Sequence, residues 1–205
     1  MRFSLILLIF VLLPQQQVAD RVVAIVNDEP IMLSELRQTL PEQAAAEEDL
    51  PQLMRTNLEA LINQALILAE IQRLKIFTVS ESEVDTALGT LAERFGSLSE
   101  MERELGSRGM TLAGLRESLR KRLLVLKFVD YRFRRYNEVA EDEIREFYEG
   151  DWSAQFRAQY PEEPLPPFEE VKGQLEQLLI ERDVNNRLDV WLQSARAEAR
   201  IIITI

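Results

Sequence analysis

Hydrophobic residues recur every three or four positions over most of the chain, which is the spacing of one face of an α-helix. The spacing runs through residues 53–75, 80–95, 98–105, 111–136 and 168–195. The two ends depart from it, as do the segments 43–49 and 150–166. The pattern therefore predicts a mainly helical protein.

Each predicted helix has an apolar face that should be buried against its neighbours. The residues on these faces are Leu58, Leu61, Ile62, Ala65, Leu66 and Ala69; then Val84, Leu88, Leu91 and Phe95; then Leu112, Leu115, Leu119, Leu126, Val129, Phe133 and Tyr136; and last Val171, Leu175, Leu178, Leu179, Leu188, Trp191, Leu192 and Ala195. Three side chains are suited to begin helices as N-caps: Ser34, Ser80 with Glu83 as a capping box, and Thr111.

The two ends of the expected fold are rich in β-branched residues, which favour strands. One such run is 21–27, followed by turn residues and a short return at Ile31 and Met32; the other is 201–205. A long apolar strand with no partner invites aggregation. We therefore expect the two terminal segments to pair into a small sheet.

The first residues resemble a secretory signal. Arg2 is followed by an unbroken apolar run from Leu5 to Leu13 and then by polar residues up to Ala19. A helix that spans a bilayer needs about 20 apolar residues, so this run is too short for one. The pattern is typical of a cleavable signal peptide over residues 1–19, and no stable membrane insertion is expected after cleavage.

Composition excludes several kinds of chemistry. The chain has no histidine and no cysteine, so it cannot build the usual nucleophile pairs or zinc sites. No phosphate-binding glycine motif is present, and the net charge of −11 opposes binding of nucleic acid. We expect no catalytic residues, no cofactor and no metal.

Two features of the sequence allow more than one interpretation: the charged segments in the middle of the chain and the proline-rich segment that follows them. The helix over 111–136 is strongly basic, whereas acidic residues crowd into 141–151. These charges either neutralise each other within the fold or form a charged rim around a binding groove. Four prolines fall within residues 161–167, and the segment 151–167 predicts a linker or a poorly ordered turn of helix.

The order of the elements resembles a known family. Residues 22–36 are similar to the opening of SurA-type and related PrsA-type foldases. The segments 58–85, 109–111, 139–149 and 167–191, and then the terminal strand, continue the match in the family's order. Each segment is a modest motif, but the ordered set is specific and covers nearly the whole chain beyond residue 19.

The resemblance implies a SurA-like multi-helix chaperone core with N- and C-terminal strands. Residues 20–149 would be the N-terminal chaperone region, 150–166 a short linker in place of the family's parvulin-type isomerase domain, and 167–205 the closing helix and strand of the same core. The family's isomerase sites rely on histidines, which this chain lacks. Ala140 stands where the family tends to have a Ser or Thr cap.

The implied function is an ATP-independent periplasmic holdase whose partners are unfolded outer-membrane or secreted polypeptides. Flexible apolar side chains suit promiscuous binding. Phe95, Leu98, Met101 and Met110 lie on the short helices near three glycines and are the candidate client-binding residues, although each could instead be core. The alternatives are an adaptor or subunit that holds one envelope partner, an isomerase homologue with residual foldase activity, and a structural dimer.

Overall fold

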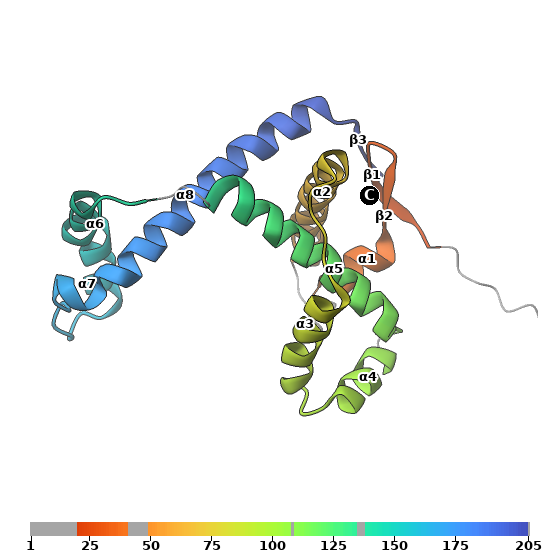
Figure 1. Cartoon of the computed structure of the whole chain (residues 1–205), viewed down its shortest axis with the longest axis horizontal. Helices are drawn as coiled ribbons and strands as arrows, with labels where there is room; N and C mark the ends of the chain where they lie inside the picture. The colour runs from red at the N-terminus through yellow and green to blue at the C-terminus, as the bar shows by residue number, and fades with distance from the viewer. Residues whose placement is uncertain (1–19, 41–48, 108, 135–137, 205) are drawn as a thin grey trace, which may run out of the picture.

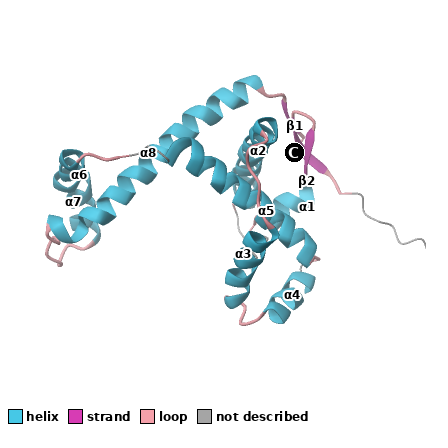
Figure 2. Ribbon diagram, viewed as in Figure 1, coloured by secondary structure: helices cyan, strands magenta, loops and turns pink. Residues whose placement is uncertain are grey.

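The computed structural model describes residues 20–40, 49–107, 109–134 and 138–204. These residues are helical except for the loops and one small sheet (Figure 2). In Figure 1 the long helix α8 runs from the short helices α6 and α7 to the sheet, and the pair α3 and α4 extends to one side of α5. The predicted mainly helical fold, with strands from both ends, is confirmed.

The three strands are β1 (Val22–Val26), β2 (Glu29–Met32) and β3 (Ile201–Ile203). They form an antiparallel sheet in the order β2-β1-β3. Ala24 lies opposite Ile203, and Val26 lies opposite Ile201. The predicted pairing of the two chain ends is therefore confirmed.

Polar contacts at the β1–β2 turn also hold the end of the chain. The turn residue Asn27 has a positive φ of 56°, and its side-chain oxygen accepts a hydrogen bond from the Arg200 N–H. The Arg200 guanidinium donates to the Asn27 carbonyl and forms an ion pair with Asp28. These contacts align β3 with β1.

Helix α1 (Leu33–Gln38) begins in a way that the sequence did not predict. Ser34 lies inside the helix and is not its N-cap. Instead, the Asp20 carboxylate accepts hydrogen bonds from the backbone N–H and the hydroxyl of Ser34. The cap is thus supplied by a residue far from the helix in sequence, and a local motif search cannot find such a cap.

The main core lies between the sheet and three helices: α2 (Leu50–Leu74), α5 (Leu112–Val129) and the C-terminal part of α8 (Phe168–Glu198). We call this region the sheet lobe. Phe128 is fully buried there and contacts the rings of Phe77, Phe133 and Trp191. The lobe thus joins segments from both ends and the middle of the chain.

The predicted apolar face of the helix over 111–136 is wrong near its centre, because the residue predicted to be buried there is exposed. Leu126 is 51% exposed, while Phe128 takes the buried position. After Val129 the chain widens into a π-helical turn, η2 (Asp130–Arg134), which brings Phe133 back to the core five residues after Phe128. A uniform period of 3.6 residues cannot predict this shift.

Helices α3 (Glu81–Glu93) and α4 (Leu98–Ser107) form a hairpin that packs on α5, which we call the arm. Both predicted caps are present nearby: Ser80 and Glu83 form a capping box, and the Thr111 hydroxyl accepts from the Gly114 N–H. Gly96, with a φ of +86°, makes the turn between the two helices.

A second core forms around α6 (Glu141–Phe147), η3 (Tyr148–Trp152), α7 (Ser153–Gln159) and the N-terminal part of α8, which we call the distal lobe. Ile144, Phe168 and Leu175 are buried in it. Leu178, predicted as buried, is 44% exposed. Where the sequence predicted a linker, residues 148–159 are helical, and only 160–167 connect without helix.

Candidate functional site

The four candidate residues lie in different environments, although all belong to the arm or its base. Phe95 and Leu98 are 40% and 44% exposed at the turn between α3 and α4. Met101 is 1% exposed, so it is a core side chain that a client could not reach in this structure. Met110 is half-buried at the base of the arm and also lines a groove described below.

The arm has a small apolar core of its own. Leu88, Ala92, Met101 and Leu105 are buried together, and side chains of α5, including Leu115 and Leu119, pack against them. Every member comes from residues 88–119. The arm is therefore held by few apolar contacts, all local in sequence.

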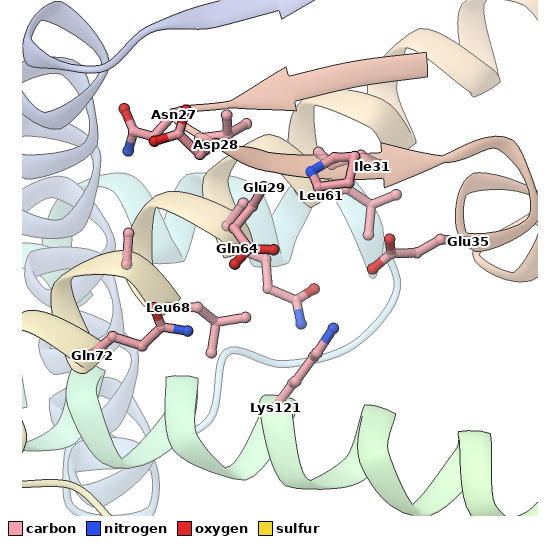
Figure 3. A pocket seen from close by; sticks show the side chains of 14 residues that line it. Asn27, Asp28, Glu29, Ile31, Glu35, Leu61, Gln64, Leu68, Gln72 and Lys121 are labelled. Carbon is pink, nitrogen blue, oxygen red and sulfur yellow. The ribbon is translucent and has the colours of Figure 1, made fainter. Parts of the chain in front are cut away.

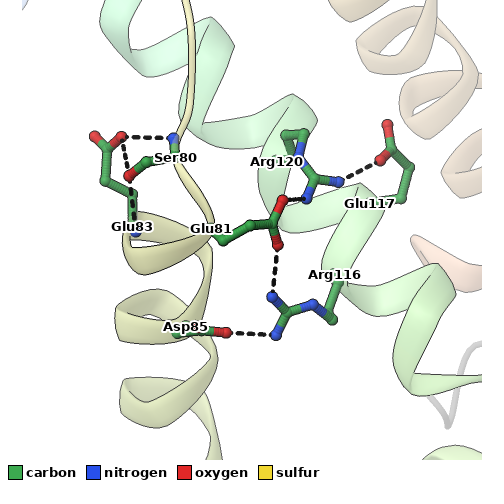
Figure 4. A network of polar contacts seen from close by, with 7 residues as sticks. All are labelled: Ser80, Glu81, Glu83, Asp85, Arg116, Glu117 and Arg120. Carbon is green, nitrogen blue, oxygen red and sulfur yellow. Dashed lines mark hydrogen bonds and ion pairs between the residues drawn. The ribbon is translucent and has the colours of Figure 1, made fainter.

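Ion pairs join α3 to α5 (Figure 4). The Arg116 guanidinium contacts Asp85 at 2.6 Å and Glu81 at 2.8 Å, and Arg120 contacts Glu81 at 2.5 Å. Hydrogen bonds from Arg116 and Arg120 hold the pKa of Glu81 below its usual range. Single surface pairs contribute little, but a connected network fixes the orientation of α3 on α5.

A second contact closes the base of the same helix. Lys127 of α5 pairs with Glu83 at 2.6 Å and donates to the Thr78 carbonyl. This contact, together with hydrogen bonds from Ser80, lowers the pKa of Glu83 to about 2. Arg116, Arg120 and Lys127 of α5 are thus paired within the fold, but with α3 and not with the acidic stretch 141–151. That stretch has other partners, such as Lys172 for Glu141.

A groove runs between α2 and α5, formed by two adjoining pockets of about 330 and 690 Å³. The two pockets share Glu35, Leu61, Gln64 and Lys121. Figure 3 shows the smaller pocket, where Gln64 and Lys121 extend into the space between the two helices. We call the two pockets together the α2–α5 groove.

The lining of the groove combines apolar and polar side chains. Its apolar residues are Leu61, Ala65, Ile67, Leu68, Met110, Leu115, Val125, Leu188 and Leu192. Acidic residues come from β2 and α1, as Glu29 and Glu35, and also from α5 and α8, as Glu117 and Asp189. The basic residues, Lys121 and Arg122, come from α5. Such a groove can take apolar side chains while polar groups stay hydrated at its walls.

Sequence reasoning placed Met110 in a binding region but missed the rest of the groove. The helical spacing predicts Leu61 as a buried residue, which it is, and it gives no role to Gln64 or Lys121. The groove depends on how α1, α2 and α5 cross, which no helical spacing encodes. One weak signal was present: Gln64, Leu68 and Gln72 alternate at intervals of four along α2.

Aromatic residues form a row along η3 and α7 in the distal lobe. Tyr148, Trp152, Phe156 and Tyr160 follow at intervals of four, with ring centroids 5.1–5.5 Å apart. The Tyr148 hydroxyl donates to the carbonyl of Pro166. This row explains why residues 148–159 form helix instead of a linker.

Two absences concern the described residues alone. Within residues 20–40, 49–107, 109–134 and 138–204, no three His, Cys, Asp or Glu side chains are grouped as a metal site would require. None of the helices in these ranges is long and apolar enough to cross a membrane.

Comparison with known proteins gives consistent matches. A family model for the SurA N-terminal domain matches residues 19–128. The protein named Chaperone SurA in Pseudomonas aeruginosa is 31% identical over 139 residues, which cover 64% of this chain and 33% of that protein. Chaperone SurA of Pseudomonas syringae pv. tomato is 30% identical, with coverages of 72% and 35%. The chain thus spans about a third of the length of these curated relatives.

A solved structure supports the fold. It comes from work on the virulence factor PEB4 and the periplasmic protein Cj1289, two SurA-like chaperones of Campylobacter jejuni. The TM-score is 0.55 at 14% identity, and the match covers 89% of this chain and 98% of that one. The similarity includes α8 and the distal lobe as well as the region that the family model covers.

Proposed function

The chain belongs to the SurA N-terminal domain family, and we propose that it is an ATP-independent chaperone that holds unfolded outer-membrane or secreted proteins in the periplasm. The single observation that carries the proposal is the α2–α5 groove. It offers apolar surface to an unfolded chain, and the polar residues of its walls interrupt that surface, so that it is not one continuous apolar patch that would promote aggregation.

Holding without ATP requires that release be spontaneous. Weak contacts spread over a groove meet this need, because a micromolar complex dissociates quickly at ordinary association rates. Phe95 and Leu98, exposed at the tip of the arm, would add a second apolar contact for a long client. Met110 would connect the two surfaces, since it packs on the arm and lines the groove.

The direct test is suppression of aggregation. The purified protein in several-fold excess should delay aggregation of a urea-unfolded β-barrel protein and of two unrelated unfolded proteins, without nucleotide. Delay of all three supports a holdase. Protection of none would overturn the proposal and favour an adaptor that holds a single partner.

A photo-crosslinking amino acid locates the contact. Placed at Lys121, it should label the bound client, whereas the same group at Gln174 should not. Gln174 is exposed on α8 in the distal lobe and lines neither pocket. Equal labelling at both positions would contradict a groove-centred site.

The remaining parts of the proposal concern export and catalysis. Mass spectrometry of the exported protein should find a chain that starts near Asp20, as a cleaved signal requires. A proline-peptide assay should find no isomerase activity, because the chain has no histidine and only a short segment between α6 and α8.

A further inference from the structure

Carboxamide side chains of α2 that line the α2–α5 groove differ in their hydrogen bonding. Asn63 lines the larger pocket, and its side-chain oxygen accepts two hydrogen bonds from Arg196 of α8 at 2.7 and 3.0 Å. Gln64 and Gln72 face the α2–α5 groove, and neither has a hydrogen-bond partner among the described residues. The groove therefore presents amide groups with free donors and acceptors.

The spacing of these amides is close to that of an extended polypeptide. Gln64 and Gln72 are eight residues apart on a helix, so they lie about 12 Å apart along its axis. Four residues of an extended strand span about 13 Å. Leu68 lies between the two glutamines and also lines the groove, where it would contact an apolar side chain.

The charged residues of the groove can bind the N–H and the C=O groups of a polypeptide backbone. Glu29 and Glu35 come from β2 and α1, and Lys121 and Arg122 from α5; no ion pair of these four is found within the described ranges. Asp189 of α8 also lines the larger pocket, as does Glu117 of α5, which is paired with Arg120. Carboxylates accept from N–H groups, and cations donate to C=O groups. A carboxamide does both, so it can make two hydrogen bonds to the N–H and C=O of one residue of an extended strand, which point to the same side.

We infer that the groove binds its client as an extended strand through the peptide backbone, with Gln64 and Gln72 each pairing with the N–H and C=O of one residue, the two residues being about four positions apart. This rests on the proposed function and adds the mode of recognition. Backbone pairing makes binding tolerant of sequence, because every polypeptide carries the same amide groups. Leu61, Ala65 and Leu68 then add affinity for apolar side chains.

The test uses two peptides with identical side chains. One is an ordinary ten-residue peptide from an unfolded client; in the other, alternate amide bonds are replaced by esters, which removes N–H donors and weakens C=O acceptors. The dissociation constants are measured by fluorescence anisotropy. The unaltered protein should bind the ester peptide about tenfold more weakly.

The variants locate that difference. In the double variant Gln64→Leu and Gln72→Leu, the ester and amide peptides should bind about equally, whatever the change in absolute affinity. The control Gln52→Leu changes an exposed glutamine of the same helix that lines neither pocket, and it should keep the tenfold ratio. Circular dichroism confirms that each variant is folded.

Failure of the inference differs from failure of the proposed function. Equal binding of both peptides by the unaltered protein, with aggregation still suppressed, would overturn backbone pairing and leave the chaperone role intact. A tenfold ratio that persists in the double variant would place the backbone contacts elsewhere and overturn the assignment to Gln64 and Gln72. Loss of both peptide binding and aggregation suppression in the unaltered protein would overturn the proposed function itself.

Discussion

The sheet lobe and the arm are held together by different means. The core of the sheet lobe takes residues from β1, α2, α5 and α8, so its contacts join distant parts of the chain. The arm buries five residues from one local stretch, 84–105, and adds surface ion pairs. The first arrangement loses stability only when the whole fold opens, whereas the second can open by itself. Local units with few buried contacts occupy the low-stability end of a protein.

This difference suits a holdase. The α2–α5 groove lies where the two regions meet, since α5 forms one wall of the groove and also carries the arm. A rigid α2 keeps one wall fixed, and an arm that opens easily could admit clients of different size. The comparison becomes testable through four changes, two in each region.

The largest effect is expected from a cavity in the sheet lobe. Ile62 is fully buried on α2, so Ile62→Ala should destabilise the fold by about 2–5 kcal/mol. For a chain of this size, that corresponds to about 5–15 °C in melting temperature. Thermal unfolding followed by circular dichroism measures it. A shift below about 2 °C would mean that the lobe does not unfold as one unit.

The next effect comes from the strand that closes the sheet. Deletion of residues 201–205 exposes the edge of β1 and removes the Thr204 N–H bond to the Val23 carbonyl. The melting temperature should fall by several degrees, and the protein should aggregate more readily because β1 becomes an apolar edge. An unchanged melting curve would show that β3 does not stabilise the fold.

The terminal pairing also shows how much the sequence could predict. Strong β propensity at both ends, with only helices between, left one consistent solution, and the structure has it. The cap of α1 and the turn η2 could not be predicted in this way. Asp20 reaches Ser34 only once β1 and β2 are in place, and the π-helical turn is set by how Phe128 and Phe133 pack against Trp191.

The candidate site was predicted less well than the fold, for a related reason. Apolar residues near glycines were the predicted client-binding residues, and two of them, Phe95 and Leu98, are exposed at the tip of the arm. Met101 has the same chemistry, but it faces inward because α4 turns that side toward α3 and α5. The groove is made by helices that cross, so its residues share no sequence pattern.

A smaller global effect is expected from a cavity in the arm. Met101→Ala removes a side chain that is 1% exposed, yet its neighbours are only the arm and α5. Amide protection in α3 and α4 should be lost while the melting temperature of the sheet lobe changes by less than about 2 °C. Hydrogen exchange resolved by segment measures both. Equal loss of protection in α2 would show that the arm and the lobe unfold together.

The smallest effect is a pH dependence confined to the arm. Lys127 holds the pKa of Glu83 at about 2, below its ordinary value of 4.5. The carboxylate therefore stabilises the folded arm fully above about pH 4.5, and this contribution is lost as the pH falls toward 2. Amide exchange in α3 should accelerate over that range. High salt should act in the same direction at neutral pH, because it screens exposed ion pairs.

Two variants separate this contact from the general effect of acid. Glu83→Gln removes the carboxylate, so α3 should exchange faster at neutral pH and lose most of the added acceleration between pH 4.5 and 2. Glu93→Gln serves as the control, because Glu93 is exposed on the same helix and has no ion-pair partner among the described residues. It should behave like the unaltered protein. If both variants exchange alike at every pH, the Glu83–Lys127 pair contributes nothing measurable to the position of the arm, which its apolar core and the Arg116 and Arg120 pairs then hold.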